Sequence, residues 1–230
     1  MASVGLVGGL GPESTIDYYR RILQASERDD PTPAPSIVID SLDVRRAMRL
    51  VENDRPALVE YLLASVRRLA DAGVAFAAIT ANTPHVVFDD IAVRSPVPLV
   101  SIVEACVEEA RRRGLRRLAL LGTRFTMEGA FYPAVCARHG ILALPPDGAD
   151  RAWMHARYVN ELLAGEFREE TRQGVISLVE RLRDRQGVDG VVLGGTELPL
   201  LLSVSVIAGV PVLDTTAIHV AAIVDRLARG

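Results

Sequence analysis

The 230-residue sequence contains no lysine, so arginine supplies all 26 of its positively charged side chains. A lysine amine is needed to form a Schiff base with pyridoxal phosphate or with a carbonyl substrate. The phosphate-binding loop of P-loop proteins also requires a lysine. Both kinds of site are therefore excluded.

Cysteine is scarce and no apolar run is long. Cys106 and Cys136 are too few for a disulfide framework or a four-cysteine zinc site, and the histidines show no metal-ligand spacing. Every apolar run ends well before the roughly 18 residues that a membrane helix needs. Segment 1–10 lacks the basic region of a signal peptide. We therefore expect a cytoplasmic protein with no metal site and no membrane span.

Charge of neither sign dominates, since 26 positive residues face 29 negative ones. This balance does not favour binding to phosphate backbones, so nucleic acid is not an expected partner. The arginine-rich run at 111–117 ends a predicted helix, where cations stabilise the negative end of the helix dipole. No aromatic residue interrupts the run, so we interpret it as a solvated helix end.

Short apolar, β-branched runs alternate with longer amphipathic stretches along the chain. This alternation predicts an α/β fold built from parallel βαβ units. A proline-rich segment at 95–98 predicts a domain boundary. The predicted strands cover residues 3–9, 35–41, 74–80, 116–123, 140–145, 188–196 and 209–216.

Two segments resemble each other, VAFAAITANTPH at 74–85 and VDGVVLGGTELP at 188–199. Each is an apolar strand that runs into a turn with a threonine and then a proline, which indicates a weak tandem duplication. Open α/β sheets bind ligands at the carboxyl ends of their strands, so we expect a cleft between two similar halves. Asn82 and Thr83 could hydrogen-bond a carboxylate or an enolate-like oxygen there, although simple helix caps are the alternative.

A glycine turn lies between the first predicted strand and helix, in the segment GLVGGLGPES at 5–14. Pro12 suits the first position of a helix, and backbone amides around Gly8 and Gly9 could hold an anion. The dinucleotide-binding fingerprint is incomplete because Ser14 stands where its third glycine is expected. The alternatives are a carboxylate-binding turn and a tight turn with no ligand.

The chain resembles the aspartate/glutamate racemase family, within the Asp/Glu/hydantoin racemase superfamily that also includes arylmalonate decarboxylases. The resemblance implies two pseudo-symmetric, doubly wound parallel-sheet domains with the active-site cleft between them, no cofactor, no metal and a homodimer. With the last strand and helix returning to the first domain, the expected domains are 1–98 with 210–230, and 99–209. The motifs on which the resemblance to this family rests are GLVGGLGPESTIDYY, ANTPHVVFDDI, SPVPLVSIVEA, LALLGTRFTMEGAFY, VVLGGTELPLL and GVPVLDTTAIHVAA.

The sequence departs from this family at both catalytic cysteines. In the family's racemases one cysteine precedes Asn-Thr in the first turn and the other precedes Thr-Glu in the second, and the two thiols exchange the α-proton. Ala81 and Gly195 stand at these positions. Cys106 and Cys136 are remote from both turns in sequence, so we interpret them as small buried hydrophobes.

The remaining candidates for proton transfer are Thr83, His85, Thr196 and Glu197, with Asp214 and Glu13 as further alternatives, because removal of an α-proton needs a suitably placed base. His85 is a candidate because an unperturbed histidine titrates near neutrality. Arg124 is a candidate for gripping a substrate carboxylate. The predicted substrate-binding residues are Gly8, Gly9, Asn82, Thr83, Arg124, Thr126, Gly195 and Thr196.

The resemblance, taken with these residues, implies a cofactor-independent enzyme that acts on a small amino acid or carboxylate. Because both thiols are missing, we expect lyase, decarboxylase or isomerase chemistry that stabilises an enediolate-like charge with hydrogen-bond donors. One alternative is a non-catalytic protein that keeps the ligand site. The other is a racemase in which a cysteine at position 195 has been replaced by glycine.

Overall fold

The computed structural model describes residues 3–29 and 34–229, which fold as two compact units. One unit is Met1–Ile102 with Thr216–Gly230, and the other is Val103–Thr215. The expected domains, 1–98 with 210–230 and 99–209, need a correction at the strand that begins at Val210, because this strand pairs with the second sheet. Residues 1–2, 30–33 and 230 of the expected first domain lie outside the described residues.

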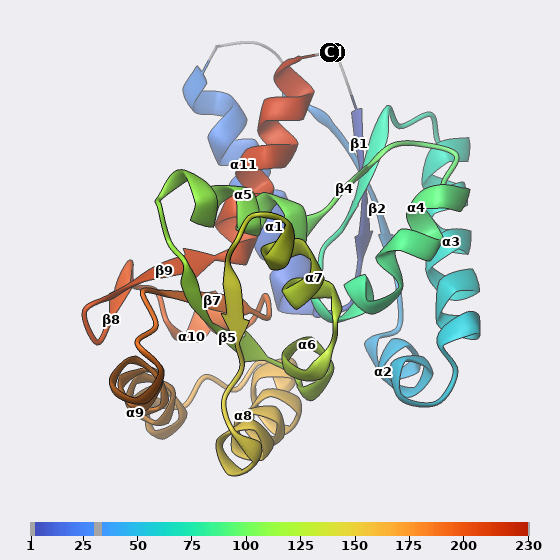
Figure 1. Ribbon diagram of the computed structural model, residues 1–230. Helices are drawn as coiled ribbons and strands as arrows, with labels where there is room; N and C mark the ends of the chain where they lie inside the picture. Colours follow the sequence, from blue (N-terminus) through green and yellow to red (C-terminus); the bar gives the residue numbers. More distant parts are fainter. Residues whose placement is uncertain (1–2, 30–33, 230) are drawn as a thin grey trace. The chain divides into compact units, whose positions relative to one another are not determined.

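The first unit contains a four-stranded parallel sheet in the order β2-β1-β3-β4. Figure 1 labels β1, β2 and β4 of this sheet. Its strands are β1 (Ser3–Gly8), β2 (Ser36–Ser41), β3 (Phe76–Ile79) and β4 (Leu99–Val100). Its helices are α1 (Pro12–Asp29), α2 (Val44–Asn53), α3 (Arg55–Asp71), the 3₁₀ helix η1 (Thr83–Val87), α4 (Phe88–Arg94) and α11 (Thr215–Ala228).

Helices cover both faces of the first sheet. On one face, Tyr18 and Ile22 of α1 form a buried cluster with Val220 and Ile223 of α11 and with side chains of β1 and β3. On the other face lies α3, whose Leu69 side chain would be 3.0 Å from a Cβ at Gly5. The sheet is therefore the middle layer of an α/β/α sandwich, as the alternating pattern predicts.

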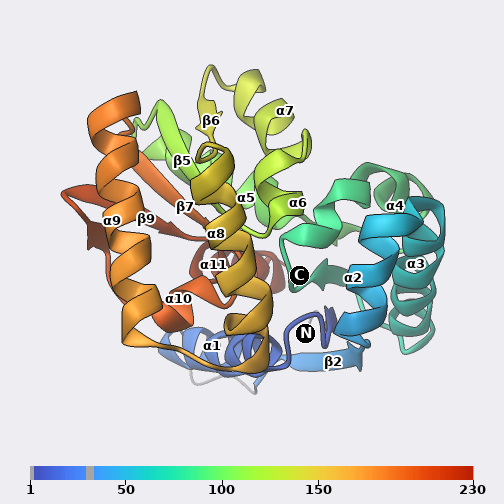
Figure 2. The same cartoon turned by 90° about the horizontal axis from the view of Figure 1, so that it is seen from below.

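The second unit has a five-stranded sheet in the order β6-β5-β7-β9-β8, parallel except for the edge strand β8. Helices α8 and α9 lie side by side on one face of this sheet (Figure 2), and they share a buried cluster with β5, β7 and β9. Its strands are β5 (Arg117–Gly122), β6 (Leu142–Leu144), β7 (Gly190–Gly194), β8 (Val206–Ile207) and β9 (Val210–Asp214). Its helices are α5 (Ile102–Arg112), α6 (Arg124–Glu128), α7 (Phe131–Arg138), α8 (Gly148–Asn160), η2 (Leu162–Ala164), α9 (Glu169–Gln186) and α10 (Leu198–Leu201).

The two sheets share one strand order. Counted along each unit, the parallel strands follow the order 2-1-3-4 in both. The two similar turns predicted from the sequence follow β3 and β7, which are the third strands of their units. The internal similarity of the sequence therefore corresponds to equivalent places in two doubly wound sheets. Across residues 3–29 and 34–229, no helix is both long and apolar enough to span a bilayer.

The arginine-rich run at 111–117 forms ion pairs and backbone contacts within its own unit. Arg111 pairs with Glu108, and Arg112 and Arg113 both pair with Glu109 one turn earlier on α5. Arg117 donates to the carbonyl oxygen of Gln186 at 2.7 Å. These contacts are typical of a helix end and agree with the interpretation from the sequence.

The hairpin between β8 and β9 has a tight turn whose conformation can be tested by substitution. Its two turn residues both have positive φ, 52° at Ala208 and 77° at Gly209, which is the pattern of a type I′ turn. Asparagine tolerates this conformation better than alanine. We therefore expect Ala208→Asn to raise the free energy of unfolding by roughly 0.5–1 kcal/mol. Urea denaturation should show a higher midpoint with an unchanged slope, whereas Ala208→Val should lower the midpoint.

Candidate functional site

The predicted site residues lie in turns that follow the first and third strands of each unit. β1 is the neighbour of β3, and β5 is the neighbour of β7. In doubly wound sheets, ligands bind beyond the carboxyl ends of the strands, where the strand order reverses. With the order 2-1-3-4, this reversal falls between β1 and β3 in one unit and between β5 and β7 in the other. The fold therefore places the predicted residues at the two switch points.

The glycine turn after β1 is shaped by close contacts within the first unit. Gly9 has φ +73°, and a Cβ there would lie 2.6 Å from the backbone nitrogen of Leu42. The Gly9 amide donates to the hydroxyl of Thr15 at 2.9 Å. A Cβ at Gly8 would lie 2.6 Å from Thr15 Cγ2. The glycines are thus required for a tight turn, and the Gly9 amide, which we expected to hold an anion, is bound to Thr15.

The turn after β3 presents Asn82 and Thr83. The strand is held at its end by Thr80, whose hydroxyl donates to the Val7 carbonyl of β1 at 3.0 Å. Asn82 is buried and precedes η1, and no side-chain cap bond from Asn82 to this helix is formed. Thr83 begins η1 and is partly exposed. The helix-cap alternative for Asn82 is therefore not supported.

His85 is buried beneath this turn. Its Nδ1 donates to the Ala81 carbonyl at 3.0 Å, and its Nε2 accepts the Ile102 amide at 3.4 Å. The ring also stacks on Phe88, with 4.7 Å between centroids. Burial, together with the charge of His219, lowers the pKa of His85 to about 3. Both ring nitrogens of His85 are bound to backbone groups, which favours a structural role over that of a proton carrier.

The turn after β5 holds two further predicted residues. Thr123 caps α6 by accepting the Thr126 amide at 3.3 Å, and Thr126 is fully buried. The backbone amide of Arg124 donates to Nδ1 of His155 at 3.1 Å, which ties this turn to α8. The Arg124 guanidinium lies 5.1 Å from the ring centroid of Phe125. The partly exposed Arg124 is thus held at the switch point of the second unit.

The turn after β7 contains a buried carboxylate. Gly195, Thr196 and Glu197 are all buried. The hydroxyl of Tyr158 donates to Glu197 Oε2 in a short hydrogen bond, and the hydroxyl of Thr196 lies 3.3 Å from the same oxygen. Burial and the neighbouring Glu197 charge raise the pKa of Tyr158 well above its usual value, so this residue stays a neutral phenol. The turn therefore offers a carboxylate fixed by two hydroxyls.

Tyr158 also fills the space beside Gly195. A Cβ built on Gly195 would lie 2.6 Å from Tyr158 Cζ and closer still to Cε2 and the hydroxyl oxygen. Such distances are shorter than van der Waals contact, so no larger side chain fits at 195 while Tyr158 keeps its place. The tyrosine ring occupies the volume that a side chain at this position would take.

The chain matches a known protein family over nearly its whole length. The sequence profile described as Asp/Glu/hydantoin racemase matches residues 7–223. The chain belongs to the Asp/Glu/hydantoin racemase family. The resemblance stated from the motifs is thereby confirmed, together with the α/β fold that it implies, and the racemase relatives indicate an isomerase.

Several relatives of this racemase-family protein align along nearly their full length. A broad specificity amino-acid racemase of Bacillus subtilis is 27% identical over 224 residues, which cover 93% of each chain. A putative Asp/Glu racemase structure from Yersinia pestis is 34% identical, with a TM-score of 0.87. The structure of an aspartate racemase homologue from Pyrococcus horikoshii is 31% identical, with a TM-score of 0.83. Each structural alignment covers 99% of this chain and 100% of the other.

The two cysteines of the racemase-family protein lie in helices rather than in the site turns. Cys106 is in α5 and Cys136 is in α7, and both are fully buried. Burial raises the pKa of Cys136 to about 11, and burial followed by the nearby Cys136 raises the pKa of Cys106 further. A reactive cysteine needs a lowered pKa, so these thiols are suited to packing. Within the described part of the chain, no cluster of three or more His, Cys, Asp or Glu residues suits a metal ion.

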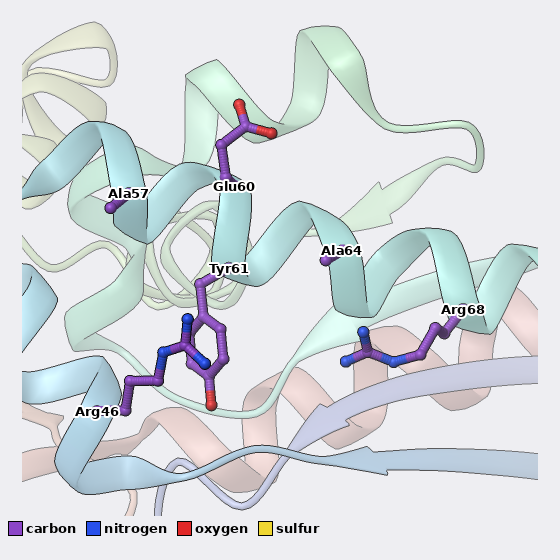
Figure 3. Close-up of a pocket in the computed structure, with 6 residues that line it drawn as sticks. All are labelled: Arg46, Ala57, Glu60, Tyr61, Ala64 and Arg68. Carbon is purple, nitrogen blue, oxygen red and sulfur yellow. The ribbon is translucent and has the colours of Figure 1, made fainter.

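A pocket of about 590 Å³ lies elsewhere on the first unit, between α2 and α3 (Figure 3). Arg46 of α2 lies over the ring of Tyr61 of α3, with its guanidinium carbon 4.5 Å from the ring centroid. Arg68 lines the same pocket and pairs with Asp40 of β2 at 2.6 Å. The pocket contains none of the predicted site residues, and its arginines contact an aromatic ring and a carboxylate of the protein itself.

Two residues at the site were not among the sequence candidates. His155 and Tyr158 lie three positions apart on α8, so they share one face of this helix and reach the turns after β5 and β7. The sequence contains one indirect signal for Tyr158. A glycine in place of a side chain at 195 leaves space in a close-packed core, and a large neighbour has to fill it.

Proposed function

We propose that this racemase-family enzyme acts at the α-carbon of a small amino acid or related carboxylate, without a cofactor and without a thiol pair. Its reaction is an isomerisation, or a lyase or decarboxylase step, that passes through an enolate-like negative charge. The buried Glu197 in the turn after β7 is the observation that carries this proposal. A homodimer in the cytoplasm belongs to the same proposal and is supported by the family resemblance and the composition.

Polar groups at the two switch points supply the proposed substrate contacts. Asn82 and Thr83 follow β3, and Thr196 follows β7. The side-chain amide of Asn82 and the hydroxyl of Thr83 are donors suited to a carboxylate or to the developing enolate oxygen, whereas the single hydroxyl proton of Thr196 is donated to Glu197. Removal of one donor from such a site typically lowers the rate about 10²–10³-fold. Arg124 and Thr126, after β5, are the proposed partners of a second polar group on the substrate.

Glu197 is the proposed acid/base. A threonine hydroxyl is too weakly acidic to replace a thiolate without help, whereas a carboxylate can accept an α-proton when it is correctly placed. Two hydroxyls fix the orientation of the Glu197 carboxylate, since both approach Oε2. The proton that leaves the α-carbon would move onto Glu197, and the electron pair would remain on the substrate as the enolate.

Incubation in deuterated water tests the proposed function directly. The purified protein would be mixed with L- and D-amino acids and with small dicarboxylates, followed by chiral and mass analysis. Deuterium at the α-carbon supports the proposal, and inverted configuration identifies an isomerase. A product of changed mass identifies a lyase or decarboxylase. Saturable binding with neither change contradicts the proposal and assigns the chain as a non-catalytic binding protein.

Glu197→Gln is expected to lower deuterium exchange at least 100-fold, because the amide keeps the size of the side chain and cannot accept the proton. Glu161→Gln is the matched control. Glu161 is another buried glutamate of the same unit, and it is bound by Thr171 and Arg157. The control should lose stability but keep its exchange rate per folded molecule. Equal exchange in wild type and Glu197→Gln would exclude Glu197 as the base.

A further inference from the structure

We propose that Tyr158 is a positioning residue for Glu197, and that the glycine at 195 is what lets the tyrosine hydroxyl reach this carboxylate. The inference rests on the proposed role of Glu197 in proton transfer. Tyr158 of α8 lies 39 positions from Glu197 in the sequence, so this role could not be predicted from neighbouring residues.

The packing around Tyr158 leaves the ring little freedom. Tyr158 is 3% exposed and belongs to the cluster that joins α8 and α9 to the second sheet. Met154, one turn earlier on α8, and Val191 of β7 belong to the same cluster. A side chain held in such a core keeps one rotamer, so the hydroxyl is presented to the turn at a fixed place.

The Tyr158 hydroxyl and Glu197 Oε2 are both buried, and burial strengthens the hydrogen bond between them. Glu197 is 2% exposed, so water cannot easily compete for its carboxylate oxygen. A hydroxyl that donates to an ionised carboxylate is among the stronger hydrogen bonds of proteins. It also favours the charged form of the carboxylate and thereby opposes the effect of burial, which favours the protonated form. The phenol thus fixes the orientation of Glu197 and favours its charged form.

Position 195 determines whether this contact can form. A Cβ there would overlap the ring and the hydroxyl of Tyr158, as the distance of 2.6 Å to Cζ shows. The Tyr158 hydroxyl therefore occupies the space that a side chain at position 195, just after β7, would need. The other titratable residue that α8 brings to these turns, His155, accepts the Arg124 amide instead. The Tyr158 hydroxyl is accordingly the α8 group that acts on Glu197.

Tyr158→Phe separates positioning from packing, because phenylalanine keeps the ring and removes only the hydroxyl. We expect kcat to fall about 10–100-fold with little change in KM, as for an interaction made mainly in the transition state. The acidic limb of the kcat/KM profile should move to higher pH by about one unit, because the carboxylate loses a donor to its charged form. Tyr132→Phe is the matched control, since Tyr132 is a fully buried tyrosine of α7 that bonds Cys106. It should show the wild-type profile.

The positioning role of Tyr158 can be tested even if no substrate is turned over. With ¹³C-labelled glutamate, the Glu197 carboxyl signal can be titrated by NMR in wild type and in Tyr158→Phe. A higher pKa in the variant supports positioning, whether or not turnover is found. An unchanged titration, or a Tyr158→Phe enzyme with wild-type kcat and an unmoved acidic limb, would overturn the inference and leave Tyr158 as core packing. Absence of exchange in wild type would count against the proposed function alone.

Discussion

Gly195→Ala is expected to lower the free energy of unfolding by about 3 kcal/mol. The new methyl group would meet the Tyr158 ring, with Cζ 2.6 Å away, and the ring is enclosed by the core of the second unit. Overpacking of this kind costs about 1–3 kcal/mol. Displacement of the ring also breaks the hydroxyl bond to Glu197, and a hydrogen bond to a charged group is worth about 1.5–3 kcal/mol.

A double-mutant cycle measures the coupling between positions 195 and 158. Combined with Tyr158→Leu, which vacates the space, Gly195→Ala should cost less than about 1 kcal/mol, because neighbours in contact are strongly non-additive. Gly148→Ala is the matched control, since a Cβ at Gly148 meets nothing within 4 Å. Urea denaturation of all variants gives the free energies. A Gly195→Ala protein as stable as Gly148→Ala would show that Tyr158 does not fill this space.

The same clash bears on the alternative that glycine at 195 replaced a cysteine. If only the thiol were missing, Gly195→Cys alone would restore racemisation in a stable protein. The geometry predicts instead that Gly195→Cys is destabilised and that Tyr158 must move before a thiol can enter the site. Full racemase activity in a stable Gly195→Cys variant would therefore support the alternative and contradict the packing described here.

The parallel strands and the two ligand-facing turns could be predicted because their signals are local. Buried parallel strands are continuous apolar runs, so β3 and β7 stand out from the helices beside them. The small polar residues that follow these strands are equally visible. The elements that were not predicted include α2, which holds several arginines, and the strands β4 and β8, which are only two residues long.

The remaining features depend on contacts between distant parts of the chain. The strand at β9 was assigned to the first domain, but Val212 pairs with Val191 of β7, and no property of the strand alone decides between two sheets. His85 looked like a proton carrier because histidine titrates near neutrality, and only the fold shows that backbone groups occupy its ring nitrogens. Tyr158 reaches Glu197 from a helix that is separate in sequence, and periodicity identifies it only as a core residue.

Acidification from pH 7 to pH 5 is expected to lower the free energy of unfolding by up to about 4 kcal/mol, through two buried histidines. Burial and then the charge of His219 lower the pKa of His85 to about 3, and burial lowers the pKa of His219 to about 4. His219 is held neutral between the Tyr18 hydroxyl at 2.9 Å and the Val100 carbonyl at 3.0 Å. Both histidines thus stay unprotonated in the folded chain across this range.

The direction follows from proton binding in the two states. In the unfolded chain both histidines titrate near pH 6.5, so below that pH the unfolded state binds more protons than the folded state. Stability is therefore complete above pH 6.5 and declines as the pH falls toward the folded pKa values. Each histidine contributes about 1.4 kcal/mol per pH unit in this interval, which gives about 2 kcal/mol each at pH 5.

Substitution of His85 and of His219 can determine how much each contributes to the pH dependence of the free energy of unfolding. His85→Gln and His219→Gln remove buried hydrogen bonds, so both should be less stable at pH 7, but each should lose about half of the decline between pH 7 and pH 5. His139→Gln, at a partly exposed histidine after α7, serves as the control and should keep the full decline. Urea denaturation at several pH values measures the slopes. A wild-type stability that stays flat from pH 7 to pH 5 would mean that His85 and His219 accept protons inside the folded chain, against the neutral hydrogen-bonding described for both rings.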